Sequence, residues 1–248
     1  MKVSIIIPAY NEAGTVSELL TRVWNQPLSL EKEIIIIDSG STDGSREIIK
    51  AFVKEKGASA RDIVKVLLQD RPRGKGNAVR EGFTHATGDI ILIQDADLEY
   101  EVTDYSALLA PIVEGKTAFV LGSRHMSDAG WQIRNFEGAL GKAHFMNYGA
   151  LLFHGFFNLL YNTKLTDPTT MYKVFRRDCL DHLTVSANRF DFDFELLGKL
   201  IRAGFRPIEI PVTYTSRGFK EGKKVSILRD PPLWVWIILK TRFSPLEK

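Results

Sequence analysis

Residues 90–99 read IILIQDADLE, and the interpretation of the whole chain begins from this stretch. Four aliphatic residues in succession, without alternation, are typical of a strand that is buried on both faces of a parallel sheet. Asp95 and Asp97 follow it directly, and side chains two positions apart in extended chain point the same way. Two such carboxylates repel each other unless one is protonated or a cation lies between them. Because Mg²⁺ binds carboxylates together with substrate phosphates, the stretch predicts a divalent-cation site; the alternative is an acidic surface turn.

Similar apolar runs recur on both sides of this stretch and alternate with helical patterns. Strands are predicted at 3–7, 34–37, 63–68, 90–93 and 118–121, and helices at 15–26, 45–56, 76–86 and 103–114. Thr15 and Glu18 fit a capping box at the start of the first helix. Strand–helix alternation with short connections predicts an α/β fold with a parallel sheet and right-handed crossovers. Ligands bind beyond the carboxyl ends of such strands. We therefore expect one edge of the sheet to gather residues 8–12, 38–44, 70–76, 95–99 and 123–124.

The second half of the chain is less regular. The pattern predicts a loop at 123–142, a helix ending at 161, a strand at 171–175, a helix at 193–203, a strand at 207–212 and a basic loop at 215–229. Two apolar, aromatic stretches, 149–161 and 232–239, are interpreted either as buried helices or as helices at a membrane interface.

Composition restricts the class of protein. The chain has 248 residues, 44% of them hydrophobic, which is ordinary for a globular protein. Its net charge of +3 is too small to argue for a nucleic-acid partner. The single cysteine, Cys179, excludes an internal disulfide framework and is itself interpreted as a small buried hydrophobe. With no secretory leader and no apolar run of about 18 residues, we expect a cytoplasmic protein without a transmembrane span.

Polar motifs follow three other strands. PAYNE at 8–12 and DSGSTDG at 38–44 are rich in capping and turn residues, so helix capping is the alternative to the binding role that we favour. Tyr10 and the acid at the strand end are not needed for capping, and such an acid can bind a base or a ribose. RGKG at 73–76 opens a helix and could attract an anion, or could be an ordinary turn; it matches neither the P-loop nor G-x-G-x-x-G.

The ordered motifs PAYNE, IIIIDSGSTDG, RGKGNAVREGF, QDADLEY, GSR, LTDPTTMYKVFRRD and SRGFKEGKKVS resemble those of family 2 glycosyltransferases. Within that family they most resemble the dolichol-phosphate mannose synthase and polyprenyl-phosphate glycosyltransferase group. The resemblance implies the glycosyltransferase A fold, a nucleotide-binding, mostly parallel sheet flanked by helices with a C-terminal acceptor-side elaboration. It also implies an inverting mechanism. We expect a single domain, with a nucleotide-sugar-binding half at 1–124 and an acceptor-side half at 125–248.

The resemblance also implies a set of site residues. The residues expected to bind the nucleotide sugar are Pro8, Tyr10, Glu12, Ile37, Asp38, Lys75, Asp95, Ala96, Asp97 and Arg124. Mg²⁺ or Mn²⁺ is expected on Asp95 and Asp97, with Glu99 as a further candidate ligand. The residues expected to act in catalysis are Asp97, Arg124, Arg217 and Lys223. Many relatives carry two acids where this chain has Asp38-Ser39, which leaves the identity of the donor's base open.

Three functions follow from these motifs. The basic loop favours transfer of a sugar to a polyprenyl phosphate at the cytoplasmic membrane face, with a separate membrane protein as a candidate partner. A phosphate is already ionised near neutral pH and needs no general base. Transfer to a sugar hydroxyl would need one, and the candidates are Asp167, Asp191, Asp193 and Glu195. The third function is nucleotide binding or nucleotidyl transfer, which the intact acid pair and the PAYNE motif disfavour.

Overall fold

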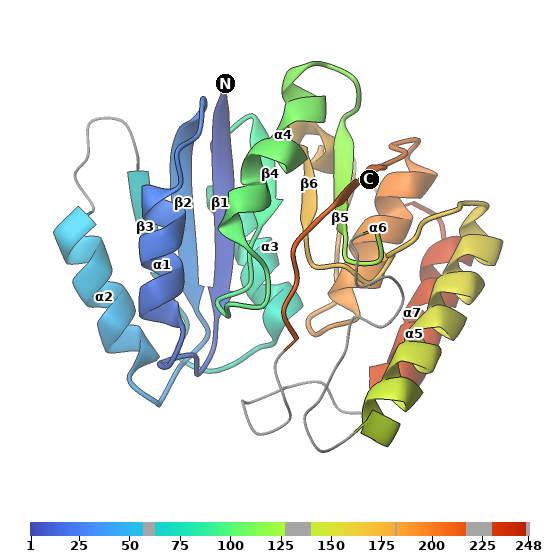
Figure 1. Ribbon diagram of the computed structural model, residues 1–248, viewed down its shortest axis with the longest axis horizontal. Coiled ribbons are helices and arrows are strands. Elements are labelled where there is room, and N and C mark those ends of the chain that lie inside the picture. Colours follow the sequence, from blue (N-terminus) through green and yellow to red (C-terminus); the bar gives the residue numbers. More distant parts are fainter. Residues whose placement is uncertain (57–62, 127–139, 182, 217–229, 247–248) are drawn as a thin grey trace.

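The computed structural model describes residues 1–56, 63–126, 140–181, 183–216 and 230–246 (Figure 1). The strands are β1 (Lys2–Ala9), β2 (Glu31–Asp38), β3 (Ile63–Leu68), β4 (Ile90–Ile93), β5 (Phe119–Ser123), β6 (Lys173–Arg176) and β7 (Ile208–Pro211). The α-helices are α1 (Val16–Asn25), α2 (Ser45–Lys56), α3 (Lys75–His85), α4 (Tyr105–Val113), α5 (Leu140–Tyr161), α6 (Phe192–Arg202) and α7 (Asp230–Phe243). Short 3₁₀ turns lie at Val102–Asp104 and Arg177–Leu180.

All seven strands form one sheet in the order β3-β2-β1-β4-β6-β5-β7. β1 to β4 pair in parallel, as the alternation of strands and helices predicts, and β5 pairs in parallel with β7. Among the strands of the described residues, only β6 is antiparallel, to both β4 and β5. The sequence pattern does not reveal this reversal, because β6 follows a long excursion through α5 and not a short crossover. The mostly parallel sheet predicted from the sequence is confirmed.

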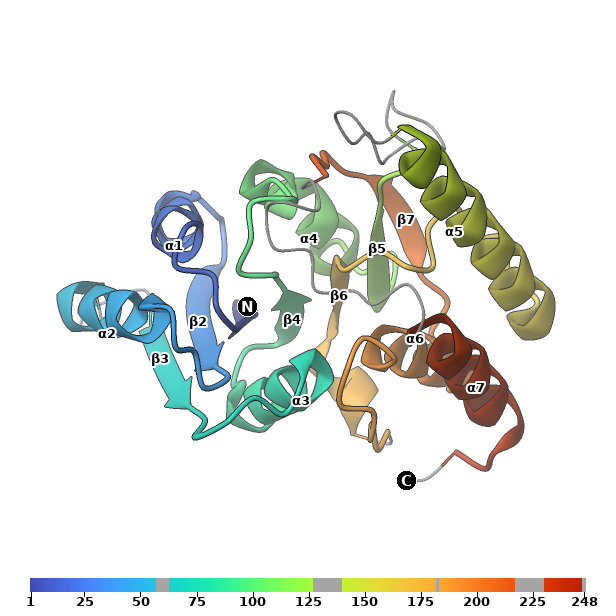
Figure 2. The same ribbon diagram turned by 90° about the horizontal axis from the view of Figure 1, so that it is seen from below.

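The core lies at the centre of the sheet. Ile5–Ile7, Ile34–Ile37 and Ile90–Ile93 have no exposed surface, as expected for strands covered on both faces. Helices α1, α2 and α4 lie over one face, and α3 and α6 lie over the other (Figure 2). Pro8 interrupts none of this pairing, because β4 pairs with β1 only as far as Ile6. The strand therefore continues through Pro8 to Ala9, beyond its predicted end.

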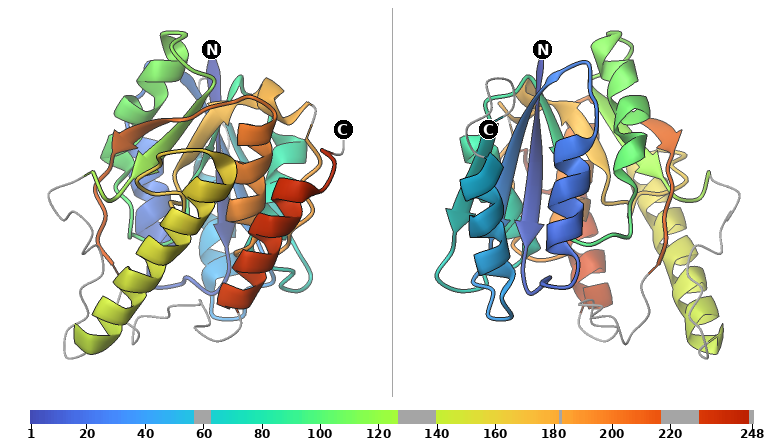
Figure 3. Two further views of the ribbon diagram at one scale, coloured as in Figure 1. Left: turned by 90° about the vertical axis from the view of Figure 1, so that its right-hand side faces the viewer. Right: turned by 60° about the vertical axis from the view of Figure 1, so that its left-hand side comes forward.

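Two further helices, α5 and α7, pack against α6. α5 and α7 run side by side in the same direction (Figure 3), and Arg242 Nε donates to the Leu160 carbonyl at 2.7 Å. The inner faces of the pair meet α6, where Phe194 packs against Trp234 with ring centroids 5.7 Å apart. Both predicted apolar stretches are therefore helical. None of the described helices combines the length and the apolar content needed to cross a bilayer.

The predicted capping box at the start of α1 is wrong. The Thr15 side chain makes no capping hydrogen bond. Its hydroxyl lies 3.2 Å from the Glu12 carboxylate and 3.1 Å from the Ala96 carbonyl oxygen, and Glu18 pairs with Arg22 at 2.6 Å. Thr15 therefore connects the loop after β1 to the loop after β4 instead of capping its own helix.

Candidate active site

The loops that follow the parallel strands meet at one edge of the sheet, the lower edge in Figure 1. The loops after β1 and β2 are joined by hydrogen bonds. The Asn11 and Glu12 amides donate to the Ser41 and Ser45 hydroxyls at 3.0 and 2.8 Å. The polar residues of both motifs thus hold the loops in place while lining the edge, so capping-type bonds and a binding edge occur together.

The candidate nucleotide residues differ in accessibility. Tyr10 is exposed and Glu12 is half-buried, whereas Ile37 and Asp38 are fully buried at the end of β2. Arg46 Nε lies 2.6 Å from Asp38 Oδ2. The Asp38 carboxylate is therefore paired with Arg46 at this edge, which the sequence pattern did not predict.

Asp95, Ala96 and Asp97 lie directly beyond β4. Lys75, the first residue of α3, places its ammonium nitrogen 2.9 Å from Asp95 Oδ1. Asp97 is almost fully buried, and its Oδ1 accepts a hydrogen bond from the Glu99 amide at 3.1 Å. Below the loop, Gln94 Oε1 accepts hydrogen bonds from the Tyr105 and Tyr172 hydroxyls at 2.9 and 2.8 Å. The acidic loop is therefore supported from the core.

The acidic loop fits a hard divalent cation. Its carboxylates are the donors that Mg²⁺ and Mn²⁺ prefer, and a lysine ammonium already lies against Asp95. Burial raises the pKa of Asp95, Lys75 counteracts that shift, and the Asp193 and Glu99 carboxylates add to it. Asp95 and Asp97, with Glu99 close by, would hold the ion.

Lys75 also connects this loop to α6. Its Nζ lies 3.6 Å from Asp193 Oδ2, and Asp193 Oδ1 lies 2.9 Å from Lys173 Nζ on β6. Asp193, a candidate general base, thus comes next to the acidic loop, but as a member of an ion-pair chain. Burial opposes its ionisation, yet Lys173 and Lys75 hold the pKa of Asp193 below its ordinary value.

The other candidate bases are engaged locally. Glu195 is buried and accepts hydrogen bonds from the Ser186 and Ala187 amides at 2.9 and 2.6 Å, and from Lys199 at 2.7 Å. Asp191 Oδ1 accepts a hydrogen bond from the Arg189 amide at 2.9 Å. These contacts favour structural roles for both acids.

Gly74, directly before α3, is required by its backbone conformation and by close packing. Gly74 has a φ of +96°, and a Cβ there would lie 2.2 Å from the Asn188 carbonyl oxygen. Only glycine fits both conditions. The RGKG motif is therefore required for close packing as well as for placing Lys75 at the edge.

Arg124 and Asp167 form a closed pair beyond β5. Arg124 Nε and Nη2 donate to the two Asp167 oxygens at 2.6 and 2.8 Å, and the Arg124 amide donates at 3.1 Å. The guanidinium also lies 5.1 Å from the centre of the Tyr214 ring. Burial alone would raise the pKa of the Asp167 carboxyl, but Arg124 holds it well below its usual range.

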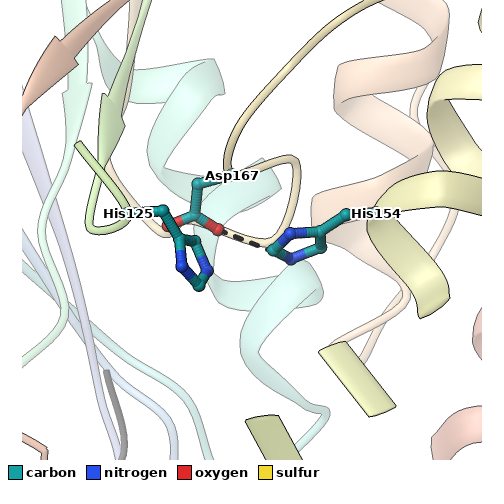
Figure 4. Close-up of side chains that lie close together, drawn as sticks. All are labelled: His125, His154 and Asp167. Carbon is teal, nitrogen blue, oxygen red and sulfur yellow. Dashed lines mark ion pairs between the residues drawn. The ribbon is translucent and has the colours of Figure 1, made fainter. Parts of the chain in front are cut away.

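Two histidines adjoin this pair. His125, His154 and Asp167 bring their ligand atoms within 4.8 Å of one another (Figure 4), and two imidazoles with a carboxylate suit a transition-metal ion. Arg124 and Thr169 already donate to Asp167, however, with Thr169 Oγ1 3.0 Å from Oδ1. An ion at this cluster would have to displace those donors, so the acidic loop is the better fit.

Arg217 and Lys223 lie outside the described residues. The chain that leads to them is described: the Tyr214 hydroxyl donates to Glu99 Oε2 at 3.0 Å, and the Thr215 amide donates to the Glu99 carbonyl at 2.8 Å. Thr215, two positions before Arg217, is thus fixed against the acidic loop.

The sequence does not reveal the supporting roles of Thr15, Gln94, Tyr172 and Lys173, because each depends on a contact with a residue distant in the chain. One signal was available for Lys173. It is a lysine inside an otherwise apolar predicted strand, and such a residue needs a buried partner.

Comparison with known proteins gives consistent matches. A family model described as Glycosyl transferase family 2 matches residues 4–184. A dolichol-phosphate mannosyltransferase of Pyrococcus furiosus is 28% identical over 90% of this chain and 59% of its own length. An undecaprenyl-phosphate 4-deoxy-4-formamido-L-arabinose transferase of Enterobacter sp. is 30% identical over 90% of this chain and 62% of its own. The chain thus spans about three fifths of the length of these curated relatives.

Two solved structures share the fold. Glucosyl-3-phosphoglycerate synthase from Mycobacterium tuberculosis, in complex with Mn²⁺, UDP-glucose and phosphoglyceric acid, has a TM-score of 0.68 and 17% identity, covering 98% of this chain and 80% of its own. Mannosyl-3-phosphoglycerate synthase from Rubrobacter xylanophilus has a TM-score of 0.66 and 17% identity, covering 97% and 72%. At these identities the likeness is one of fold.

Proposed function

This chain belongs to glycosyl transferase family 2, and from that premise we propose that it transfers a sugar from a nucleotide-sugar donor to a polyprenyl phosphate, with inversion. Its sheet has the glycosyltransferase A fold, which the two synthases share. The observation that carries the proposal is the position of Asp95 and Asp97, at the carboxyl end of the central strand β4 and beside Lys75. Such an edge suits a donor diphosphate.

The nature of the acceptor is inferred from the names of the relatives and from the contacts that the candidate general bases make. Both curated relatives are named for lipid-phosphate substrates. In this chain Glu195 and Asp191 accept local backbone hydrogen bonds, and Asp193 is bound by two lysines. A phosphate acceptor needs no proton removed near neutral pH, since its second pKa is about 6. Hydroxyl transfer is the alternative, and Asp193 is its best-placed base.

The chemistry then divides among the chain's own groups. Asp95 and Asp97 would bind Mg²⁺ or Mn²⁺, which supplies positive charge to the leaving diphosphate. Lys75 contributes a cation at the same edge, and we propose that Pro8, Tyr10, Glu12, Ile37 and Asp38 form the nucleoside side. Arg124, Arg217 and Lys223 would stabilise the phosphates of donor and acceptor as the bond to the anomeric carbon is exchanged.

A lipid acceptor requires contact with a membrane surface, and one face of the molecule suits it. The α5–α7 face consists of the exposed apolar side chains Tyr148, Leu151, Leu152, Leu159, Val235, Trp236 and Phe243. Residues 140–164 and 231–246 contain no Asp or Glu, whereas the exposed Lys164, Lys240 and Arg242 are cationic. Aromatic and aliphatic groups bordered by cations are typical of interfacial helices on anionic lipid. We propose that the protein works on the membrane surface.

Product identification tests the proposal. Purified protein is incubated with nucleotide sugars of different bases, Mg²⁺ or Mn²⁺, and a short polyprenyl phosphate, and the lipid is analysed by mass. A mass increase of one glycosyl unit supports the proposal. Transfer only to hydroxyl acceptors would replace it with the alternative function, and nucleotide binding without any transfer would contradict both.

A further inference from the structure

A buried lysine on β6 has no role in the reaction described so far. Lys173 has no exposed surface and lies between the buried residues Tyr172 and Val174. Its ammonium donates to the Thr170 carbonyl and lies 2.9 Å from Asp193 Oδ1. Burying a charged group is costly, so a lysine at this depth requires its partner.

Lys173 begins a chain of alternating charges that ends at the acidic loop. Lys173 Nζ contacts Asp193 at 2.9 Å, Asp193 lies 3.6 Å from Lys75 Nζ, and Lys75 contacts Asp95 at 2.9 Å. The four residues come from β6, α6, α3 and the loop after β4. Lys75 therefore lies between two carboxylates, and the nearer one is the candidate ligand of the donor's cation.

We propose that Lys173 and Asp193 are positioning residues that, through Lys75, set the charge that the edge presents to the donor's diphosphate and its cation. This inference rests on the proposed function. Lys173 neutralises Asp193, which leaves Lys75 with Asp95. Lys75 can then offset the acidic loop and attract the diphosphate without competition from α6.

The proposal predicts effects of opposite sign on anion and cation binding. Lys173→Met leaves the Asp193 carboxylate to compete for Lys75, and the edge becomes one unit more negative. Diphosphate binding should weaken, and Mn²⁺ binding should strengthen. Asp193→Asn removes an anion and should do the reverse. The double variant Lys173→Met/Asp193→Asn removes both charges and should return both affinities toward those of the unchanged protein.

The experiment measures two affinities in each variant. Mn²⁺ alone is titrated by electron paramagnetic resonance, and UDP and GDP are titrated by calorimetry at saturating Mn²⁺. For Lys173→Met we expect the nucleotide dissociation constant to rise on the order of tenfold, as for one charge acting across about 10 Å at an effective dielectric constant near 20. Lys65→Met is the matched control, because Lys65 also pairs with a buried carboxylate, Glu33, at 2.7 Å but in strands away from this loop. It should change neither affinity.

The outcomes separate a positioning role from a structural one. Opposite shifts in the single variants, restored in the double variant, support the proposal. Losses of both affinities in proportion to lost thermal stability, or unchanged affinities, overturn it while the proposed function stands. If Asp193→Asn, which leaves a buried cation, is not recovered folded, the comparison of Lys173→Met with the double variant decides the result alone. If the unchanged protein binds neither UDP, nor GDP, nor the nucleoside diphosphates of the other bases, the proposed function is wrong, and this inference falls with it.

Discussion

The loops after β4 and β5 differ in how their charged side chains are paired. Beyond β4, three acids, Asp95, Asp97 and Glu99, follow within six positions of the strand, and the partly exposed Asp95 pairs with Lys75 at 2.9 Å. Beyond β5, Arg124 and Asp167 neutralise each other in a fully buried pair. An edge with excess negative charge favours a cation from outside, whereas a closed pair needs none. The first loop therefore suits a cation as ligand, whereas the second pair fixes the Arg124 guanidinium that we propose contacts the phosphates.

Breaking the closed pair should produce the largest effect. Asp167→Asn leaves the Arg124 guanidinium buried without its counter-charge and should lower the free energy of unfolding by about 3–5 kcal/mol. Urea unfolding at pH 7 measures it. Asp178→Asn, which loses an exposed pair with Arg176, is the control and should cost less than about 1 kcal/mol.

The same pair has a pH signature. The pKa of Asp167 is depressed in the folded protein, so its contribution is present above the unfolded pKa of about 3.9 and is lost as pH falls toward the lower folded pKa. The stability difference between the unchanged protein and Asp167→Asn should therefore shrink below about pH 5. A constant difference down to pH 3 would contradict the assignment.

Mutating the acidic loop should damage function and spare stability. Asp95→Asn and Asp97→Ala should each lower turnover by roughly 10²–10³-fold or more, since preorganised charge stabilises the leaving group. Steady-state kinetics with added Mn²⁺ measures turnover, and thermal unfolding should change little for Asp95→Asn. Full activity in chelator, or in either variant, would remove the cation-centred mechanism.

The same contrast explains what the sequence could predict. The candidate site at residues 90–97 can be predicted because the acids directly follow an apolar strand. The loops after neighbouring parallel strands lie at the same edge of the sheet, so their residues can be predicted as well. Asp167 and Lys173 give no local signal of this kind. Their partners, Arg124 and Asp193, are 43 and 20 positions away. Their pairing depends on β6 entering antiparallel between β4 and β5, which no short pattern encodes. The Thr15 hydroxyl contacts the Ala96 carbonyl, 81 positions away, which a local capping pattern cannot predict.

We propose that the basic segment that follows Thr215 binds phosphates, so in this contrast it belongs with the acidic loop. Arg217→Ala and Lys223→Ala should each weaken turnover or substrate affinity roughly tenfold, because a charge-assisted hydrogen bond contributes about 1.5–3 kcal/mol. Kinetics with donor and polyprenyl phosphate varied separately show which phosphate is contacted. Lys220→Ala should have a smaller effect that fades as salt rises. Wild-type kinetics in both main variants would separate this segment from the site.

The α5–α7 face should contribute a smaller, several-fold effect. Leu152 and Trp236 are 76% and 62% exposed. Leu152→Glu and Trp236→Glu should each reduce sedimentation with anionic vesicles, because a charged group replaces apolar contact at the interface. Val113→Glu, at an exposed valine on α4, is the matched control and should bind as before. Equal vesicle binding by all three variants would remove this face from the proposal.

The smallest expected effect tests the acceptor. Asp191 is a candidate general base, yet its Oδ1 accepts a hydrogen bond from the Arg189 amide, two positions earlier. If the acceptor is a phosphate, Asp191→Asn should cost little turnover, since the amide oxygen can still accept that bond and no proton has to be removed. Loss of a general base would instead cost roughly 10²–10⁴-fold. Single-turnover rates on matched phosphate and hydroxyl acceptors distinguish the two, with substrate binding measured in parallel. A large loss at Asp191 with binding intact would mean that an acid outside the β4 loop takes part in the chemistry, and the contrast between a ligand-binding loop and its structural surroundings would then have to be redrawn to include the start of α6.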